Sequence, residues 1–323
     1  MPKIQVDNIS RNGSSTTRRE KALKNQEQLV IEARERRQQT IIGVIVVIIV
    51  IAMLSAIGVT TYQAVYAPMQ MKIEQSDKSK NELKKLSAKY KPKMANAEGG
   101  ILMSKLGYNK PAGKAPTVAV YFDPLCPGCG EFNRTADKTL FTMLKAGQIN
   151  LELHPMSFLD QFSAGSYSSR VTSSIEYIAE NDDNPEHLMR FINNIFSKDF
   201  QPEEGKKQKP VSNEQLIEQA KKAGIDASVA SKAFERRYLV WQRAINKYVP
   251  DFLELLNVSG PSKGSMTTPT VTINGKLLDM NAASEKNMKT LDAILHCIGL
   301  NKEKVGVAGE MPKVSNTDSP ISL

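Results

Sequence analysis

Two cysteines stand three residues apart in the segment Cys126-Pro127-Gly128-Cys129, and the third cysteine of the chain, Cys297, lies far from them. At this spacing two sulfurs can form a disulfide of acceptable geometry. The apolar segment before the pair and the helical pattern after it predict that Cys126 stands at a helix N-terminus. Unpaired amides and the helix dipole stabilise an anion there, so we expect a thiolate near neutral pH and a redox-active dithiol or disulfide.

The two cysteines are predicted to have different roles. Cys126 is expected to be the exposed nucleophile that forms a mixed disulfide with a substrate, and Cys129 the buried thiol that resolves it. Pro127 suits the first helical turn, because its missing N–H would have no partner there. Pro127 and Gly128 are therefore the residues expected to tune the reactive sulfur.

Two alternatives for the motif remain open behind the redox interpretation. A zinc site usually needs two such cysteine pairs, and the sequence has a single CxxC. His296 and Cys297 are adjacent, which is a poor arrangement for two ligands of one metal. A purely structural disulfide would close so short a loop that it would constrain the unfolded chain little. No metal and no cofactor is expected.

An apolar segment near the N-terminus predicts a membrane anchor. Residues 41–59 contain no charged side chain, and a helix of this length spans about 29 Å, which matches the hydrocarbon core of a bilayer. Arg34, Arg36 and Arg37 precede it, and no basic residue follows until Lys72. This asymmetry places the N-terminus in the cytoplasm and the rest of the chain outside.

A cleaved signal peptide is the main alternative to an uncleaved anchor. The basic segment before the apolar run is long for a signal peptide, and so is the run itself. Cleavage after Val65-Tyr66-Ala67 would leave Pro68 as the first residue, which disfavours cleavage. A buried core helix is disfavoured because no face of the run is polar.

Composition supports a folded domain with polar flanks. The chain has 323 residues, 41% of them apolar, and a net charge of +9. The basic residues are spread out and form no dense stripe with interleaved aromatic residues, so no nucleic-acid partner is expected. Three cysteines are too few for a disulfide-stabilised scaffold, so the fold must depend on a hydrophobic core.

The pattern along the chain predicts five regions. They are a cytoplasmic polar tail (1–39), a transmembrane signal anchor (40–60), an extracytoplasmic stalk that is partly helical (61–97), a globular domain (98–302) and a disordered tail (303–323). Within the globular domain we expect strands at 100–103, 117–122 and 149–156, a helix from the CxxC to about 146, helices over 168–179, 184–196, 212–223 and 227–256, a hairpin over 270–278 and a final helix over 283–300. The helical block occupies about residues 165–257.

The order of these features resembles the DsbA-like branch of the thioredoxin superfamily, in the membrane-anchored form of Gram-positive bacteria. The features are a strand, a CPxC at a helix start, inserted helices, and Thr267-Thr268-Pro269-Thr270 opening a hairpin. The resemblance covers about residues 98–300. It implies an α/β thioredoxin fold with an inserted helical block, preceded by a single transmembrane helix, and a protein thiol–disulfide oxidoreductase that needs no cofactor.

The resemblance also implies roles for distant residues and for partners. Pro269 would be cis and would face the active-site sulfurs, and Thr268 would offer backbone groups to an extended substrate strand. The implied partners are exported cysteine-containing proteins, a membrane redox partner of the DsbB or VKOR type, and the lipid bilayer through residues 41–59. The expected location is the cell membrane, with a single span and the catalytic domain extracytoplasmic.

Two positions depart from the family pattern. Well-studied oxidases of this family have histidine where this chain has Gly128, and that histidine can make the disulfide more oxidising. Thioredoxins bury a carboxylate six residues before the nucleophile, and Val120 stands at that position. Asp123 is closer to the cysteines and is interpreted mainly as a turn or helix-cap residue. These departures leave the redox potential open.

Three functions remain in view. The leading one is an oxidase that introduces disulfides into exported proteins. A reductase or isomerase would use the same chemistry in another direction, and a non-catalytic binding or chaperone module would use the helical block alone. Cys297 is expected to be a buried structural thiol and Trp241 to pack in the helical block, while His154 and His187 receive no role.

Overall fold

The computed structural model describes residues 21, 34, 67–205, 210–314 and 318–321. The chain divides into two units, residues 1–70 and 71–323, and the second is described below. The predicted span at 41–59 lies outside the described residues, as does the polar tail at 1–39 except for Lys21 and Arg34. No helix among the described residues is long and apolar enough to cross a membrane.

A six-stranded mixed sheet forms the centre of the second unit, in the order β2-β1-β4-β3-β5-β6. Only β3 and β4 run parallel, and every other neighbouring pair is antiparallel. The strands are β1 (Ile101–Ser104), β2 (Gly107–Tyr108), β3 (Thr117–Phe122), β4 (Asn150–Pro155), β5 (Thr270–Ile273) and β6 (Lys276–Leu277). The strand β3 agrees with the prediction at both ends, whereas the two-residue β2 was not expected.

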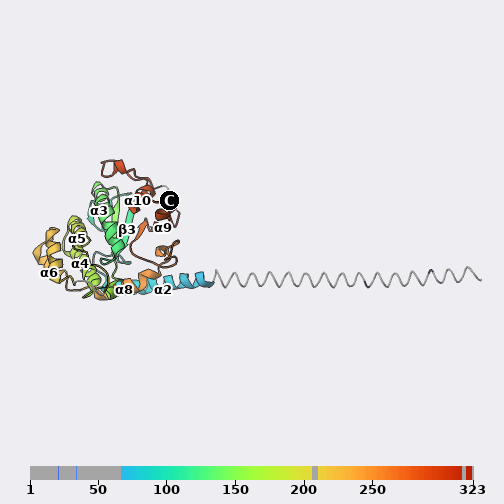
Figure 1. The fold of residues 1–323 in the computed structure, drawn as a ribbon, viewed down its shortest axis with the longest axis horizontal. Helices are drawn as coiled ribbons and strands as arrows, with labels where there is room; N and C mark the ends of the chain where they lie inside the picture. Colours follow the sequence, from blue (N-terminus) through green and yellow to red (C-terminus); the bar gives the residue numbers. More distant parts are fainter. Residues whose placement is uncertain (1–20, 22–33, 35–66, 206–209, 315–317, 322–323) are drawn as a thin grey trace, which may run out of the picture. The chain divides into compact units, whose positions relative to one another are not determined.

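The helices fall into two groups along the chain. The helices α4, α5 and α6 lie together in Figure 1, and β3 separates them from α9 and α10 in that view. The helices are α2 (Ala67–Tyr90), α3 (Pro127–Ala146), α4 (Tyr167–Asn181), α5 (Pro185–Ile195), α6 (Asn213–Lys222), α7 (Ala227–Lys232), α8 (Leu239–Tyr248), α9 (Met280–Glu285) and α10 (Thr290–Ile298), with short 3-10 helices η2 (Asp160–Phe162), η3 (Val249–Asp251), η4 (Leu253–Leu255) and η5 (Lys302–Lys304).

The central strand β3 is buried on both faces. Val118, Val120 and Phe122 belong to the main hydrophobic cluster, which includes side chains of α3, α4, α5 and α10. Ala119 and Tyr121 belong to a second cluster on the other face. Successive side chains of a strand point to opposite faces, so a strand covered on both sides must be apolar throughout.

The second face of the sheet is covered by α2 and α8, which lie beside each other in Figure 1. Leu83 of α2 and Trp241 of α8 are both fully buried in this cluster. Lys80 of α2 also forms a 2.7 Å ion pair with Glu254. Within the expected stalk, residues 67–90 are therefore helical, and from Met71 onward this helix packs against the domain. Trp241 packs with other residues of the helical block, as expected, and this packing belongs to the second cluster.

The inserted block runs from α4 to α8 and confirms the predicted helix starts. Asn184 caps α5 by accepting a hydrogen bond from the amide of Glu186 at 3.0 Å. Ser212 and Gln215 form the predicted capping box of α6. The expected helix over 227–256 is instead divided into α7, α8, η3 and η4. Arg236 has a φ of 56° between α7 and α8, and a left-handed residue cannot continue a right-handed helix.

The C-terminal hairpin forms as predicted around Asn274-Gly275. Both turn residues have positive φ, at 51° and 78°, as a two-residue type I′ turn requires. The expected final helix over 283–300 is divided into α9 and α10. Asn287 has a φ of 54° between them, which interrupts the helix for the same reason as Arg236.

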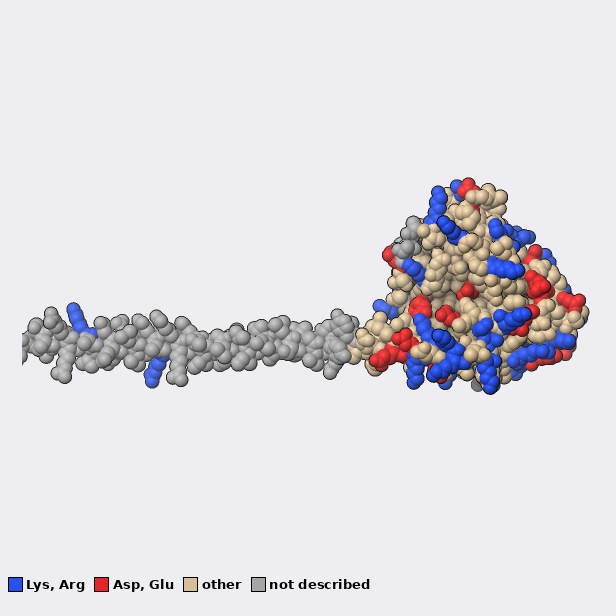
Figure 2. Space-filling model, turned by 180° about the vertical axis from the view of Figure 1, so that it is seen from behind, with Lys and Arg blue, Asp and Glu red and all other residues tan. Residues whose placement is uncertain are grey.

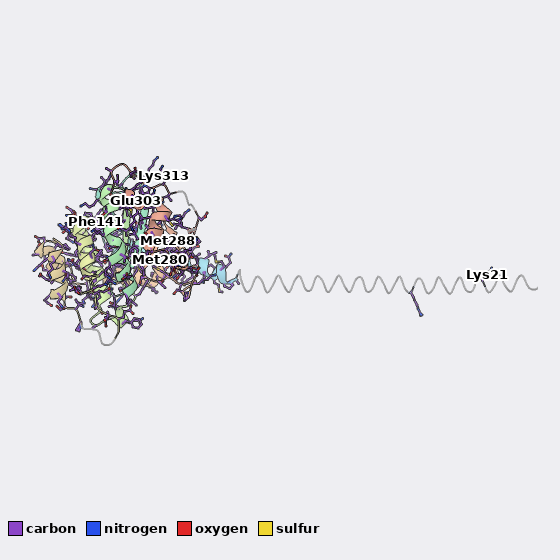
Figure 3. The ribbon with its side chains drawn as sticks, turned by 45° about the horizontal axis from the view of Figure 1, so that its top comes forward. Lys21, Phe141, Met280, Met288, Glu303 and Lys313 are labelled. Atoms are coloured by element: carbon purple, nitrogen blue, oxygen red, sulfur yellow. The ribbon has the colours of Figure 1, made fainter. Side chains whose placement is uncertain are left out.

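The segment expected to be a disordered tail is ordered in its described part. Gln148 is fully buried, and its side-chain amide donates to the carbonyl groups of Lys304 and Glu310, each at 2.8 Å. Its carbonyl accepts from the amide of Gly306 at 2.9 Å. Figure 3 shows Glu303 and Lys313, from this segment, at the upper end of the domain. The domain thus includes residues after 302, because Gln148 supplies the hydrogen bonds.

Charged side chains of both signs are interspersed on the face of the domain drawn in Figure 2. Lysine and arginine are more numerous toward the lower edge of that view.

Candidate active site

The site begins at Asp123, the first residue after β3, which is fully buried. Its Oδ1 accepts hydrogen bonds from the amide of Leu125 at 2.9 Å and from the hydroxyl of Ser168 at 2.6 Å. Its Oδ2 accepts from the amide of Leu159 at 2.9 Å. The carboxylate therefore joins the end of β3 to α4 and to the loop after β4. This agrees with the predicted role of a turn residue.

Cys126 is the N-cap residue of α3, as the motif predicts. Its φ and ψ of −62° and 122° are extended, and Pro127 occupies the first helical position. Its sulfur accepts a hydrogen bond from the amide of Cys129 at 3.4 Å. A helix leaves its first amides without partners, and the Sγ atom takes the place of the usual capping oxygen.

The environment of Cys126 lowers its pKa to about 7. A hydrogen bond with the Cys129 side chain is the largest cause, and the Cys129 amide adds to it against the opposing effect of burial. At this value a large fraction of Cys126 is thiolate at neutral pH. Only the thiolate is a competent nucleophile, so the sulfur is chemically ready to attack a disulfide.

Cys129 has the opposite environment on the same helix. Only 1% of its surface is exposed. Burial is the main reason why its pKa is raised well above the ordinary value, and the neighbouring Cys126 adds to the increase. Both sulfurs are free thiols in this structure. The protonated, buried Cys129 matches the predicted resolving thiol.

The loop before β5 lies against these sulfurs although it is more than a hundred residues away in sequence. The Thr268–Pro269 peptide bond is cis. The Cys126 thiol donates to the carbonyl oxygen of Thr268 at 3.3 Å. The antiparallel register of β3 and β5 pairs Tyr121 with Thr270, which places the start of β5 beside the end of β3. The predicted proximity of Thr268 and Pro269 to the motif is therefore seen in the structure.

The exposure of the motif differs from the expectation for one residue. Pro127 and Gly128 are exposed, whereas Cys126 retains 8% of its surface. The Thr268 carbonyl contacts its sulfur and contributes to this cover. The prediction of an exposed nucleophile is therefore wrong for this structure, because Cys126 is buried beside the exposed Pro127 and Gly128.

Gly128 lies close to the cis-proline loop. A Cβ atom at this position would stand 3.3 Å from Cδ of Pro269 and 3.8 Å from Sγ of Cys126. The first distance is shorter than ordinary van der Waals contact between carbon atoms. The absence of a side chain therefore allows the loop to approach the sulfur closely.

Gln201 also supports the motif and was not predicted. Its side-chain amide donates to the carbonyl oxygens of Cys126 at 3.0 Å and Pro124 at 3.3 Å. Arg134 of α3 donates to the other end of the same amide at 3.1 Å. A Cβ atom at Gly130 would clash with this side chain. The glycine after the second cysteine is the one sequence signal that could have indicated a close neighbour.

Cys297 is separate from this site. It lies on α10, is 5% exposed and belongs to the main hydrophobic cluster. Burial raises its pKa to about 11, so it is far less reactive than Cys126. Among the residues that the structure describes, no group of three or more His, Cys, Asp or Glu side chains could hold a metal ion.

A sequence model of a protein family described as Thioredoxin matches residues 112–293. The chain is also similar to solved structures. The reduced DsbG oxidoreductase of Mycobacterium tuberculosis is 28% identical, with 53% of this chain and 76% of that chain covered and a TM-score of 0.40. Reduced DsbA of the same organism is 24% identical (61% and 95% covered, TM-score 0.45), and the thiol–disulfide oxidoreductase MdbA of Actinomyces oris is 20% identical (69% and 90%, TM-score 0.45).

Among curated proteins, the chain is similar to the serine/threonine-protein kinase PknE of Mycobacterium tuberculosis. The two are 32% identical over 89 residues, which is 27% of this chain. The match spans only 16% of the length of PknE.

Proposed function

Because the chain belongs to the thioredoxin family, we propose that it is a protein thiol–disulfide oxidoreductase of the DsbA type. The observation that carries the proposal is the position of the Cys126 sulfur. It caps α3, accepts the amide of Cys129 and contacts the carbonyl of Thr268. A sulfur stabilised as thiolate, with a resolving thiol one turn away and a backbone carbonyl beside it, can exchange disulfides with an extended polypeptide.

The direction we propose is oxidation of exported proteins. A substrate thiolate attacks Sγ of Cys126 in the oxidised protein, the Cys126–Cys129 bond breaks, and Cys129 leaves with the electron pair and takes a proton. A second substrate thiolate then attacks the substrate sulfur of the mixed disulfide, and Cys126 leaves as thiolate. Two substrate thiols become one disulfide, and two electrons reside on the reduced motif.

The lowered pKa of Cys126 favours this direction. A thiolate that is stabilised in the reduced protein lowers the free energy of the reduced form, so the disulfide form becomes a stronger oxidant. Gly128 supplies no side chain to this effect. The stabilisation instead comes mainly from the side chain and amide of Cys129, with a further contribution from Thr268.

The reduction potential separates the proposed oxidase from a reductase. We expect equilibration with glutathione to give a value above about −180 mV, the range of disulfide isomerases and oxidases. A value near about −270 mV, typical of thioredoxin, would contradict the oxidase and favour the reductase. Cys297→Ser should be the background for all measurements, so that only the motif titrates.

Trapping of substrates tests the chemistry itself. In a Cys129→Ala variant the mixed disulfide on Cys126 has no resolving thiol, so exported cysteine-containing proteins should accumulate on it. Cys126→Ala is the matched control and should trap none. If Cys126→Ser retained full activity in cells, the protein would be a binding or chaperone module instead.

The membrane location belongs to the same proposal. We infer that residues 41–59 are a single uncleaved span, with the arginines at 34, 36 and 37 in the cytoplasm and the thiol domain outside. Reoxidation would then require a membrane partner of the DsbB or VKOR type, and the clients would be exported proteins.

Extraction and protease access test this location. The full chain should resist alkaline extraction from membranes, and protease added outside the cell should reach the thiol domain. Val46→Lys with Ile49→Lys should release the chain or block its insertion, because each charge at the centre of a span costs about 2.5–3.5 kcal/mol. Recovery of the unaltered chain in the soluble cytoplasm would contradict the location without affecting the redox proposal.

A further inference from the structure

A closed loop precedes the cis-proline and begins at Asn257. The backbone amide of Asn257 donates to the carbonyl oxygen of Ser265 at 3.0 Å, and the amide of Gly264 donates to the carbonyl oxygen of Asn257 at 2.7 Å. These two hydrogen bonds fix Ser265 beside Asn257. Ser265, at the closed end of the loop, stands three residues before Thr268.

The side-chain amide of Asn257 reaches past the closed end of the loop to Thr267. Its Nδ2 atom donates to the carbonyl oxygen of Ser265 at 2.8 Å and to Oγ1 of Thr267 at 3.0 Å. An amide nitrogen carries two hydrogens, so both are used in these bonds. The carbonyl oxygen of Thr267 also accepts a hydrogen bond from the hydroxyl of Thr270 at 2.6 Å. Thr267 is therefore held through its side chain on one side and through its backbone on the other.

The surroundings of the loop give Asn257 a fixed base. Before the loop, the hydroxyl of Ser79 on α2 donates to the carboxylate of Asp251 at 2.5 Å. Within the loop, Lys72 of the same helix donates to a backbone carbonyl at 3.3 Å. After the loop, Met266 packs against the second hydrophobic cluster. Helix α2 and this cluster therefore restrain the loop on both sides, and the amide of Asn257 extends the restraint toward the cis-proline.

Thr268 is the residue that this arrangement holds in place. It is partly exposed, and its carbonyl oxygen lies 3.3 Å from Sγ of Cys126. An extended polypeptide that pairs with the Thr268 backbone must bring its own sulfur into line with Cys126. A misplacement of about 1 Å can lower the rate of such a reaction about 10²-fold. A small dithiol makes no backbone pairing, so its reaction does not depend on the position of Thr268.

We propose that Asn257 is a positioning residue for polypeptide substrates, whose side-chain amide presents the backbone of Thr268 to an extended chain beside the Cys126 sulfur. The proposal rests on the proposed function and adds to it a residue that distinguishes polypeptides from small dithiols. Asn257 acts through the loop and not on the sulfur, because both donors of its amide are directed at Ser265 and Thr267. The thiol–disulfide exchange itself is unchanged.

The oxidation rates of a peptide and of a small dithiol test this role. Oxidised full-length protein in detergent, in the Cys297→Ser background, is mixed with an excess of an unstructured peptide that contains two cysteines, or with dithiothreitol. Acid quenching, alkylation and mass spectrometry then give the rate at which the protein disulfide is reduced. We expect Asn257→Ala to lower the second-order rate constant for the peptide about tenfold, as loss of one or two hydrogen bonds would, and to leave that for dithiothreitol within about twofold.

Thr267→Val tests the same hydrogen bond from its other end. Valine has a similar shape but offers no acceptor to the Asn257 amide, so the peptide rate should fall about three- to fivefold and the dithiothreitol rate should stay the same. Because both residues act through one bond, the double variant should oxidise the peptide as slowly as Asn257→Ala alone, within about twofold. A loss equal to the product of the two single effects would overturn the proposal. If Asn257→Ala does not fold, an unaltered peptide rate in Thr267→Val would overturn it.

Asn194→Ala is the matched control in the helical block. The side-chain amide of Asn194 also donates to a backbone carbonyl, that of Gln219 at 3.0 Å, so its loss should reduce stability in the same way. Both oxidation rates should stay at those of the unaltered protein. An unchanged peptide rate in Asn257→Ala, or an equal loss with peptide and dithiothreitol, would overturn the proposal. An unaltered protein that oxidises neither substrate would instead contradict the proposed function.

Discussion

Cys126 and Cys129 are three residues apart on one helix, and their surroundings drive their chemistry in opposite directions. At Cys126, hydrogen bonds from the side chain and amide of Cys129 and a smaller effect of the Thr268 side chain favour the thiolate and lower the pKa to about 7. At Cys129, burial under apolar side chains favours the thiol and raises the pKa. Because both residues are cysteines, the difference in reactivity comes from their positions in the first helical turn and from the groups that surround each sulfur.

The comparison extends to two buried carboxyl groups, one before the motif and one further along α3. Asp123, at the end of β3, has its three hydrogen bonds directed to the backbone and to Ser168, and it holds the loop before Cys126. Asp137, eight residues after Cys129 on α3, accepts a hydrogen bond from Asn133 and lines a small cavity. A carboxylate that accepts three hydrogen bonds holds the neighbouring backbone in place. A carboxylate that accepts one hydrogen bond can still exchange a proton.

The largest expected effect is the difference in alkylation rate between the two single-cysteine proteins. In the Cys297→Ser background, Cys129→Ser leaves Cys126, which should react with iodoacetamide with a midpoint below the ordinary cysteine value, because the serine hydroxyl can still donate to the sulfur. Cys126→Ser leaves Cys129, which should react at least about 10²-fold more slowly at pH 7, because thiolate fraction and access both fall. Mass spectrometry of timed samples measures both rates. Similar rates in the two proteins would remove the basis of the comparison.

The pH dependence of stability tests the environment of Asp137 on α3. The pKa of Asp137 in the folded protein is about 7, above its ordinary value of 3.8, so burial favours the protonated carboxyl. The contribution of this raised pKa to the free energy of unfolding is fully present below about pH 4 and is lost as the pH rises through about 7. Asparagine stays neutral throughout. The free energy of unfolding of Asp137→Asn, relative to the unaltered protein, should therefore rise by up to about 4 kcal/mol between pH 4 and pH 8.

Denaturant unfolding at a series of pH values measures this difference. Glu131→Gln, on the exposed side of the same helix, is the control and should show a nearly constant difference. A constant difference for Asp137→Asn as well would mean that its carboxylate is solvated in the folded protein.

A smaller effect is expected from Gln201→Ala. This change removes the donor to the carbonyl oxygens of Cys126 and Pro124 and leaves Arg134 with one fewer acceptor. We expect a loss of about 1–2 kcal/mol in the free energy of unfolding. The alkylation midpoint of Cys126 should shift little, because Gln201 does not contact the sulfur. Gln215→Ala, which opens the capping box of α6, is a control remote from the site.

The smallest effect is expected from Gly128→Ala. The added Cβ would stand 3.3 Å from Pro269, so the loop must move by a few tenths of an ångström. We expect the rate of mixed-disulfide formation with a peptide substrate to fall a few-fold, with less change for a small aromatic disulfide. Equal effects on both substrates would indicate that the change acts on the sulfur and not on the loop.

Much of the fold followed from local patterns. The continuous apolar run of β3, the Asn184-Pro185 start of α5, the capping box of α6 and the Asn274-Gly275 turn all lie where the sequence predicts. The failures have a common origin. Helices were expected to continue through Arg236 and Asn287, where positive φ values interrupt them. These residues are not glycine, so their conformations carry no clear signal in the sequence.

The boundaries of the domain were harder to predict because they depend on distant contacts. Helix α2 has few apolar residues, yet its Leu83 is buried in the second cluster and Leu86 packs against the same cluster. The segment after residue 302 is polar, yet the side chain of Gln148 binds its backbone. Composition indicates which segments can form a hydrophobic core. It does not indicate that a polar segment is fixed by hydrogen bonds to one buried side-chain amide, here that of Gln148.

The sequence by itself determined the reactive motif, because a helix start is local. Proline at the first helical position and cysteine before it are sufficient to place a sulfur among unpaired amides. Only the tertiary structure decided what stands around that sulfur. The pairing of β3 with β5 brings the Thr268 carbonyl to Cys126, and the packing of α3 on the sheet encloses Cys129 with Asp137. Acidity depends on burial and on charges within a few ångströms, and these are properties of the folded chain.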